Sequence, residues 1–111
     1  MKKETIEIVN KQELEEKIIA SLKTCYDPEI PVNIYDLGLI YDIDIDEQKR
    51  ATITMTLTAP NCPVADQLVM EVRDKVGAIE GIAGAEIKLV FDPPWNQSMM
   101  SEEALLELGM L

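Results

Sequence analysis

The chain has 111 residues, 47% of them hydrophobic, and its 10 basic and 21 acidic residues give a formal net charge of −11. A chain of this length forms one domain around one core, and charges interrupt its apolar residues too often for a membrane-spanning helix of about 20 apolar residues. The negative charge argues against a nucleic-acid partner, and the absence of histidine excludes Ser-His and Cys-His nucleophilic pairs and Cys/His zinc sites.

The first residues are charged and lead into no apolar segment with a cleavage site, so we expect no secretory signal and a cytoplasmic location. Cysteines in that compartment stay reduced, and we therefore treat Cys25 and Cys62 as free thiols. We expect residues 1–9 to be an N-terminal extension and residues 10–111 to form a single domain.

The first predicted element is a helix that begins after Asn10 and ends near Thr24. Asn10 and Glu13 have the spacing of a capping box. Apolar residues recur at helical spacing at Leu14, Ile18, Ile19 and Leu22. Cys25 follows the same stripe, so we expect its side chain to point into the core.

A stiff loop follows the helix, because Pro28 and Pro31 lack the amide donor that a helix needs. It carries Asp27 and Glu29, which could serve as oxygen ligands for a metal, as an acid/base pair, or as turn and cap residues. The residues leave these alternatives open. Asp36, before Leu37-Gly38, is expected to brace a turn.

Residues 39–46 and 51–58 alternate with a period of two and are separated by a polar turn, which predicts a β-hairpin. One face of the two strands is aliphatic and is expected to face helices, whereas the other face is expected to be solvated. The solvated rows are Asp42, Asp44, Asp46, Thr52, Thr54, Thr56 and Thr58.

A second helix is predicted from Pro63 to Gly81, then a third strand over residues 85–91 parallel to a neighbouring strand. A last helix is capped by Ser101 and ends at Gly109. The predicted fold is an α+β two-layer sandwich of order α-β-β-α-β-α, with a three-stranded mixed sheet and helices packed on one face.

Cys62 is the strongest candidate for a chemical role. It precedes Pro63 at the expected N-terminus of a helix, where the helix dipole and free amide groups lower the pKa of a thiol. The alternative is that Cys62 is a small buried hydrophobe. A further segment, with Trp95, Met99 and Met100, could be a lid on the core or an apolar surface for docking a partner.

Three motifs together resemble the SufT-like metal-sulfur cluster biosynthesis family, which includes PaaD-like proteins. The resemblance runs from about Leu14 to Gly109. The motifs are DPEIPVNIYDLGLIY at residues 27–41, TLTAPNCP at residues 56–63, and DPPW with MMS at residues 92–95 and 99–101.

The resemblance implies a compact domain that takes part in the maturation of iron-sulfur proteins. It puts Cys62 at the family's cysteine, Asp27 and Glu29 in its acidic loop, and Thr58 at its threonine. We expect Asp36 to support this site, and Trp95, Met99 and Met100 to dock partners. The expected partners are an iron-sulfur scaffold or client apo-proteins.

The number of cysteines limits how a cluster can be held. An iron-sulfur cluster normally takes four thiolates, and this chain has two, of which Cys25 is expected in the core. We therefore expect no stably bound cofactor, but a transient cluster or iron ion held by Cys62. The remaining ligands would come from a second Cys62 in a homodimer or from a partner.

Three alternatives to a general maturation factor remain. A PaaD-like protein would be a dedicated accessory subunit for one multicomponent oxygenase. An adaptor would work through Trp95, Met99 and Met100 and need no thiol. A thiol enzyme would use Cys62 as the nucleophile, with Asp27 or Glu29 as the base, and fits least well without histidine.

Overall fold

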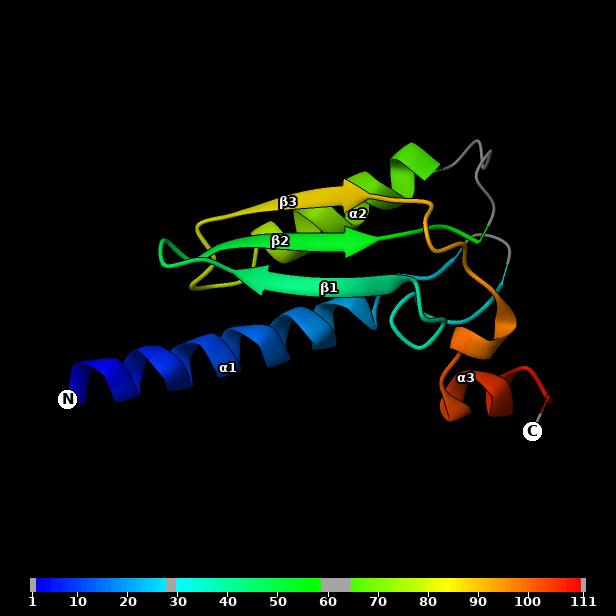
Figure 1. The fold of residues 1–111 in the computed structure, drawn as a ribbon, viewed down its shortest axis with the longest axis horizontal. Coiled ribbons are helices and arrows are strands. Elements are labelled where there is room, and N and C mark those ends of the chain that lie inside the picture. Colours follow the sequence, from blue (N-terminus) through cyan, green and yellow to red (C-terminus); the bar gives the residue numbers. More distant parts are fainter. Residues whose placement is uncertain (1, 28–29, 59–64, 111) are drawn as a thin grey trace.

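The computed structural model describes residues 2–27, 30–58 and 65–110, and side chains within residues 11–27, 30–58 and 67–110. Helix α1 (Lys2–Leu22) comes first, followed by strands β1 (Ile40–Ile45) and β2 (Arg50–Met55). Helix α2 (Ala65–Gly77), strand β3 (Gly84–Leu89), the short 3-10 helix η1 (Gln97–Met99) and helix α3 (Glu102–Glu107) complete the chain. Figure 1 shows α3 beyond one end of the sheet, and the C-terminal end of α1 lies near the same end.

The sheet has the order β1-β2-β3, with β1 antiparallel and β3 parallel to β2. The predicted hairpin and the parallel third strand are therefore confirmed. At the hairpin turn Lys49 has a φ of 66°, and Oδ1 of Asp46 accepts hydrogen bonds from the backbone N–H groups of Gln48 and Arg50, both at 2.9 Å. The aspartate thus closes the turn, as its residue type favours.

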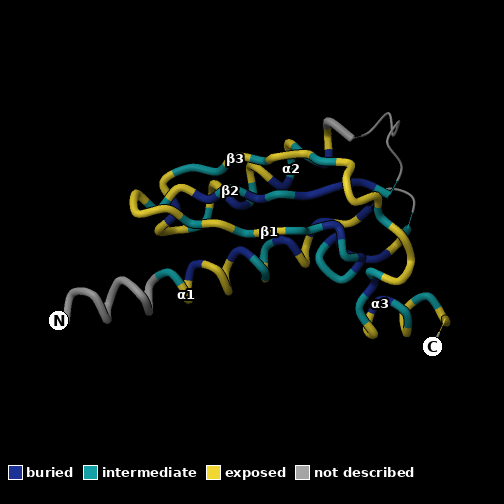
Figure 2. Tube along the Cα trace, in the orientation of Figure 1, coloured by how far each residue is buried: buried dark blue, intermediate teal, exposed yellow. Residues whose placement is uncertain are grey.

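Helices α1 and α2 pack on one face of the sheet, which confirms the predicted α+β fold of two layers. Alternate residues of β2 are buried against these helices, and Figure 2 shows the central strand as the most buried of the three. The core includes Leu14, Ile18, Leu22, Ala51, Ile53, Met55, Leu68, Val72 and Val76. The opposite face is solvated at Asp42, Asp44, Glu86 and Lys88.

One residue of the predicted solvated face is buried instead. Thr56 is only 1% exposed, so the prediction for this threonine is wrong. The chain that follows β3 explains the difference: Phe91, Pro94 and Trp95 enclose a hollow together with Thr56. The alternation of apolar and polar residues in a strand predicts on which face of the sheet a residue lies. It does not predict whether a segment from elsewhere in the chain covers that face.

Helix α1 begins well before the predicted cap. It runs from Lys2 through Asn10, so the expected helix start at Asn10 is wrong. No proline or glycine occurs between Lys2 and Leu22, and Glu7 precedes Lys11 by four positions, a spacing that favours helix. The first turns of α1 project past the sheet (Figure 1), and the separate status of residues 1–9 stays a prediction.

The remaining helix boundaries follow turn and cap residues. Helix α2 ends at Gly77, four residues before the predicted Gly81, which has a φ of 100° in the following turn. Ser101 caps α3 as predicted, since its side chain accepts a hydrogen bond from the N–H of Ala104. Across the described ranges of the chain, none of the helices combines the length and the hydropathy that crossing a membrane requires.

Candidate functional site

The carboxylate of Asp27 joins the loop after α1 to the segment that follows β2. Asp27 is 7% exposed. Its Oδ2 accepts a hydrogen bond from the backbone N–H of Ile30 at 3.1 Å, and its Oδ1 accepts one from the hydroxyl group of Thr58 at 3.3 Å. The two predicted site residues Asp27 and Thr58 are therefore in contact, and the aspartate acts as a turn residue.

Two other predicted site residues, Glu29 and Cys62, lie outside the described residues. Their roles stay predictions. In the sequence Glu29 follows Asp27 by two positions, and Cys62 follows Thr58 by four. The Asp27–Thr58 hydrogen bond thus joins the residue before Pro28-Glu29 to a residue shortly before Cys62 in the sequence.

Asp36 braces its turn, as predicted, and also holds the C-terminal segment. Its Oδ2 accepts a hydrogen bond from Asn33 Nδ2 at 2.8 Å, and its backbone N–H donates to Asn33 Oδ1 at 2.9 Å. Ser101 binds the same residue twice: Ser101 Oγ donates to Asp36 Oδ1 at 3.1 Å, and Ser101 N donates to Asp36 O at 2.7 Å. The cap residue of α3 thereby anchors this helix to the turn.

The segment with Trp95, Met99 and Met100 packs against the loop that precedes β1. The indole Nε1 of Trp95 donates to the carbonyl of Leu37 at 2.6 Å. Met99 is partly buried, and Met100 is 8% exposed within the core. The arrangement is that of a core lid, and partner docking by the segment stays a prediction, with Met100 itself out of a partner's reach.

A close backbone contact fixes the lid in place. Gly38 has a φ of +84°, and a Cβ atom at this position would overlap the backbone oxygen of Met99. The hydroxyl group of Tyr41 donates to the carbonyl of Pro93 at 2.7 Å. Position 38 therefore requires glycine for two reasons: its φ is positive, and Met99 leaves no room for a Cβ atom.

Sequence reasoning missed three residues of this region. Thr56 lines the hollow below the lid, Gly38 admits the lid, and Ser101 has a second role in binding Asp36. The glycine that directly follows the Asp36-Leu37 turn was a usable signal for a backbone of positive φ. The contacts of Thr56 and Ser101 join segments that are far apart in the sequence, which no local pattern reports.

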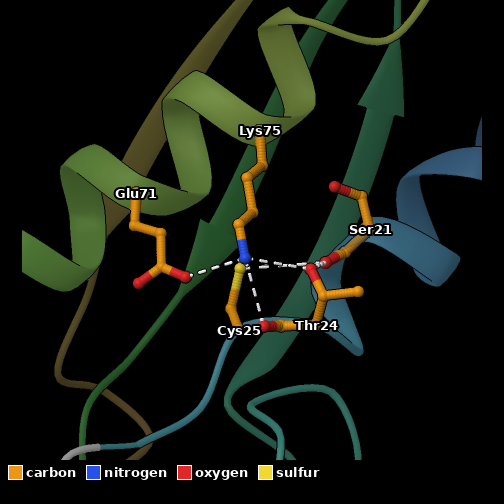
Figure 3. Close-up of polar contacts among 5 residues, drawn as sticks. All are labelled: Ser21, Thr24, Cys25, Glu71 and Lys75. Carbon is orange, nitrogen blue, oxygen red and sulfur yellow. Dashed lines mark hydrogen bonds and ion pairs between the residues drawn. The ribbon is translucent and has the colours of Figure 1, made fainter.

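The second thiol, Cys25, is buried, as predicted, and Figure 3 shows its surroundings. Its Sγ lies 3.7 Å from the carbonyl oxygen of Ser21. Lys75 Nζ contacts Glu71 Oε2 at 2.9 Å and donates to the carbonyl and hydroxyl oxygens of Thr24, both at 3.1 Å. The lysine of α2 thus links this helix to the turn that follows α1.

Burial raises the pKa of the Cys25 thiol, and the nearby charge of Lys75 opposes this effect only in part. The hydrogen bond with Glu71 raises the pKa of Lys75. A buried thiol that stays protonated is a poor nucleophile and metal ligand. Cys25 is therefore a structural residue.

Within the side chains that the structure describes, in residues 11–27, 30–58 and 67–110, the Cys, Asp and Glu residues form no group of three or more that could hold a metal ion. Both carboxylate oxygens of Asp27 accept hydrogen bonds. In this arrangement the aspartate orients the loop.

The sequence profile of the iron-sulfur cluster assembly protein family matches residues 15–89, which is more than half of the chain. The chain belongs to this family. The match begins within α1 and ends with β3, and so covers the whole sheet, α2 and the Asp27–Thr58 pair. The expected family is thus confirmed, and the match includes the first two of the three motifs, whereas the third, at residues 92–101, lies beyond it.

Two relatives of this chain carry more specific names. A Porphyromonas gingivalis protein named Fe-S protein maturation auxiliary factor is 59% identical over 97 residues, which cover 87% of this chain and 92% of the relative. The Staphylococcus aureus protein named Fe-S protein maturation auxiliary factor SufT is 37% identical over 84 residues, which cover 76% of this chain and 96% of the relative.

A solved structure has the same fold. The crystal structure of a domain of unknown function, DUF59, from Bacillus anthracis superposes with a TM-score of 0.83 at 38% sequence identity. The superposition covers 90% of this chain and 95% of that chain. The three-stranded mixed sheet and its helices are therefore the fold of this family.

Proposed function

We propose that this chain is a general maturation factor for iron-sulfur proteins that handles a cluster or iron transiently through the thiol of Cys62. The observation that carries the proposal is the 59% identity, over 87% of the chain, with a protein named Fe-S protein maturation auxiliary factor. The contact between Asp27 and Thr58 supports it, because it joins the acidic loop to the start of the segment that contains Cys62.

The cluster or iron is cargo in this proposal, and its transfer is a ligand exchange without a net change in oxidation state. The Cys62 thiolate donates an electron pair to iron and forms an iron–sulfur bond. A client cysteine then attacks the same iron, the bond to Cys62 breaks, and the client's thiol proton moves to Cys62. A single protein thiolate makes the bond labile, since a stable cluster normally has four.

The remaining ligands of the cargo come from outside one chain. Cys25 is fully buried and its thiol stays protonated, so it does not take part. The ligands would be a second Cys62 in a homodimer, or groups of the scaffold or client protein. Size-exclusion chromatography of the chain with and without reconstituted iron and sulfide separates these two arrangements.

Deletion of the gene tests the breadth of the function. Activities of several unrelated iron-sulfur enzymes are measured in cells that lack the gene, with and without the wild-type chain. A general maturation factor predicts that several enzymes lose activity together and recover together. Loss confined to one oxygenase would replace the proposal with the dedicated accessory subunit.

Thiol variants test the mechanism. Cys62→Ser should fail to restore the enzymes although the domain stays folded. Cys25→Ser is the matched control, because it removes the thiol that this mechanism does not use. Full rescue by Cys62→Ser would favour an adaptor that works without a thiol.

A further inference from the structure

Strand β3 is an edge of the sheet among the residues that the structure describes. The strand order is β1-β2-β3, and Figure 1 shows β3 at one side of the sheet with α2 behind it. In the register with β2, Leu89 lies beside Met55, and Met55 O accepts a hydrogen bond from Val90 N at 2.9 Å. Backbone groups of successive strand residues point to opposite sides, so the N–H and C=O groups of Ala85, Ile87 and Leu89 point away from β2.

The apolar side chains of β3 are less covered than those of the central strand. The residues of β2 that face the helices are at most 1% exposed. Their neighbours in β3 are only partly buried or are exposed: Ala85, Ile87 and Leu89. Phe91, just beyond the strand, is 46% exposed. An edge strand that combines outward backbone groups with uncovered apolar side chains is a template for pairing with another chain.

The charges of β3 are complementary about Ile87, because Glu86 precedes it and Lys88 follows it. A symmetry axis through Ile87 and perpendicular to the sheet would place the β3 strands of two chains side by side and antiparallel. Glu86 of each chain would then lie opposite Lys88 of the other. The backbone groups of these residues point to β2, so they form a non-hydrogen-bonded pair, in which side chains approach most closely. Opposite charges at such positions stabilise strand pairing.

Both charges are available for such a pair. Glu86 and Lys88 are exposed, and neither has a salt bridge within the part of the chain that the structure describes. They lie on the solvated face of the sheet, so pairing does not require them to be buried. A lysine on an edge strand usually discourages association, but this register provides each lysine with a carboxylate.

The other edge strand, β1, has the opposite charge pattern. Asp42 and Asp44 flank Ile43, so symmetric antiparallel pairing about Ile43 would place aspartate opposite aspartate. Like charges directly opposite each other destabilise a strand pair. The charges therefore disfavour association through β1 and favour association through β3.

We propose that two copies of this chain form a symmetric dimer through antiparallel pairing of their β3 strands, with Glu86 of each copy opposite Lys88 of the other. The outward N–H and C=O groups of Ala85, Ile87 and Leu89 bond to the second strand, and the two sheets become one. The helices of both copies cover the same face, because the axis is perpendicular to the sheet. The net charge of −11 opposes association, but salt screens charges beyond about 8 Å, whereas paired strands lie about 5 Å apart.

The dimer has two separate candidate sites. The Asp27–Thr58 hydrogen bond follows the C-terminal end of β2, which runs parallel to β3. Antiparallel pairing of the β3 strands therefore places the two Asp27–Thr58 pairs at opposite ends of the joined sheet. This arrangement favours groups of a scaffold or client over a second Cys62 as the remaining ligands of the cargo. That consequence rests on the proposed function, whereas the dimer itself does not.

Sedimentation equilibrium of the purified full chain tests the dimer. The protein is measured without iron and with a reducing agent, so that neither a shared cluster nor a disulfide can link two chains. The mass should rise with concentration from that of one chain, 12.5 kDa, towards twice this value. The mass of a single chain at millimolar concentration would overturn the proposal.

Exchange of the two charges identifies the interface. Glu86→Lys and Lys88→Glu each place like charges opposite each other, and each should weaken the dimer about tenfold. The two variants change the net charge in opposite directions, so a general effect of charge cannot explain both losses. The combined variant Glu86→Lys/Lys88→Glu restores opposite charges and should restore the wild-type dissociation constant. Glu16→Lys, at an exposed position of α1, is the control and should not weaken the dimer. Unchanged dissociation constants in both single variants would overturn the proposal.

Amide hydrogen exchange distinguishes pairing of β3 from any other dimer. The amides of Ile87 and Leu89 point away from β2 and should exchange more slowly as the protein concentration rises. The amides of Glu86 and Lys88 point to β2, and their exchange should change little. Rapid exchange of the Ile87 amide in a dimeric sample would overturn the proposal. These measurements need no iron or sulfide, so their failure and the failure of the proposed function are distinguishable.

Discussion

The hydroxyl group of Thr58 donates a hydrogen bond of 3.3 Å to Oδ1 of Asp27, across 31 positions of the sequence. The other carboxylate oxygen holds the backbone N–H of Ile30 at 3.1 Å. The side chain of Asp27 thus stabilises the turn of its own loop and links this loop to the segment that follows β2. This pair joins two of the predicted site residues.

Replacement of Thr58 tests the strength of that pair. Thr58→Val keeps the shape of the side chain but removes the hydroxyl group that donates to Asp27. It should lower the free energy of unfolding by about 1–2 kcal/mol, because the partly buried carboxylate loses a hydrogen bond. Urea unfolding of Thr58→Val is compared with Thr54→Val, which has no partner at Asp27. Equal stability of the two variants would show that the pair does not hold the loop.

Gly38 is predicted to be intolerant of a side chain. Gly38→Ala should cost at least about 2 kcal/mol, since a left-handed backbone disfavours a Cβ atom and this Cβ would overlap the backbone oxygen of Met99. Gly109→Ala is the control, because Gly109 has a φ of +71°, and apart from its chain neighbours no heavy atom of the described residues lies within 4 Å of the added Cβ. Similar losses in both variants would contradict the close approach of the lid.

Thr56→Val should make the free protein more stable. The buried Oγ1 of Thr56 has no partner among the described residues, and a methyl group of the same size removes an unsatisfied polar atom, which contributes about 1 kcal/mol. The increase is measured by thermal or urea unfolding beside Thr54→Val, for which no increase is expected. A clear loss of stability in Thr56→Val would mean that the hydroxyl group is satisfied in the protein.

Because the pKa of Cys25 is raised in the folded protein, we expect the protein to lose stability at alkaline pH. Burial raises the pKa of Cys25 above its ordinary value of 9.0, so the unfolded chain loses this proton at a lower pH than the folded chain. The contribution of the thiol is therefore complete below pH 9.0 and is lost as the pH rises through the higher folded value. The free energy of unfolding, measured with urea between pH 7 and pH 10, should fall more steeply with pH for the wild-type chain than for Cys25→Ala. Parallel pH dependences of the two free energies would contradict this account.

Local patterns were sufficient to predict most of the fold. Alternation in residues 39–46 and 51–58 gave the strands, because a sheet with one buried face requires a period of two. Ser101 and Gly109 marked the ends of α3 through cap chemistry that involves only neighbouring residues. The same kind of signal gave a wrong helix start at Asn10. A residue that can cap a helix can also lie inside one, when nothing before it ends that helix.

The candidate site was less predictable, because its contacts join distant segments. The bond from Ser101 to Asp36 spans 65 positions, and the bond from Trp95 to Leu37 spans 58. No periodicity carries such information, and the burial of Thr56 was missed for the same reason. The resemblance of the motifs predicted which segments form the site, but not that Asp27 and Thr58 are in contact.

The most direct test of the account is the activity of several unrelated iron-sulfur enzymes in deletion cells that carry either Cys62→Ser or Cys25→Ser. The account predicts that Cys25→Ser restores all of these enzymes and that Cys62→Ser restores none, at equal levels of folded protein. Equal rescue by both variants would contradict the central role of the Cys62 thiol.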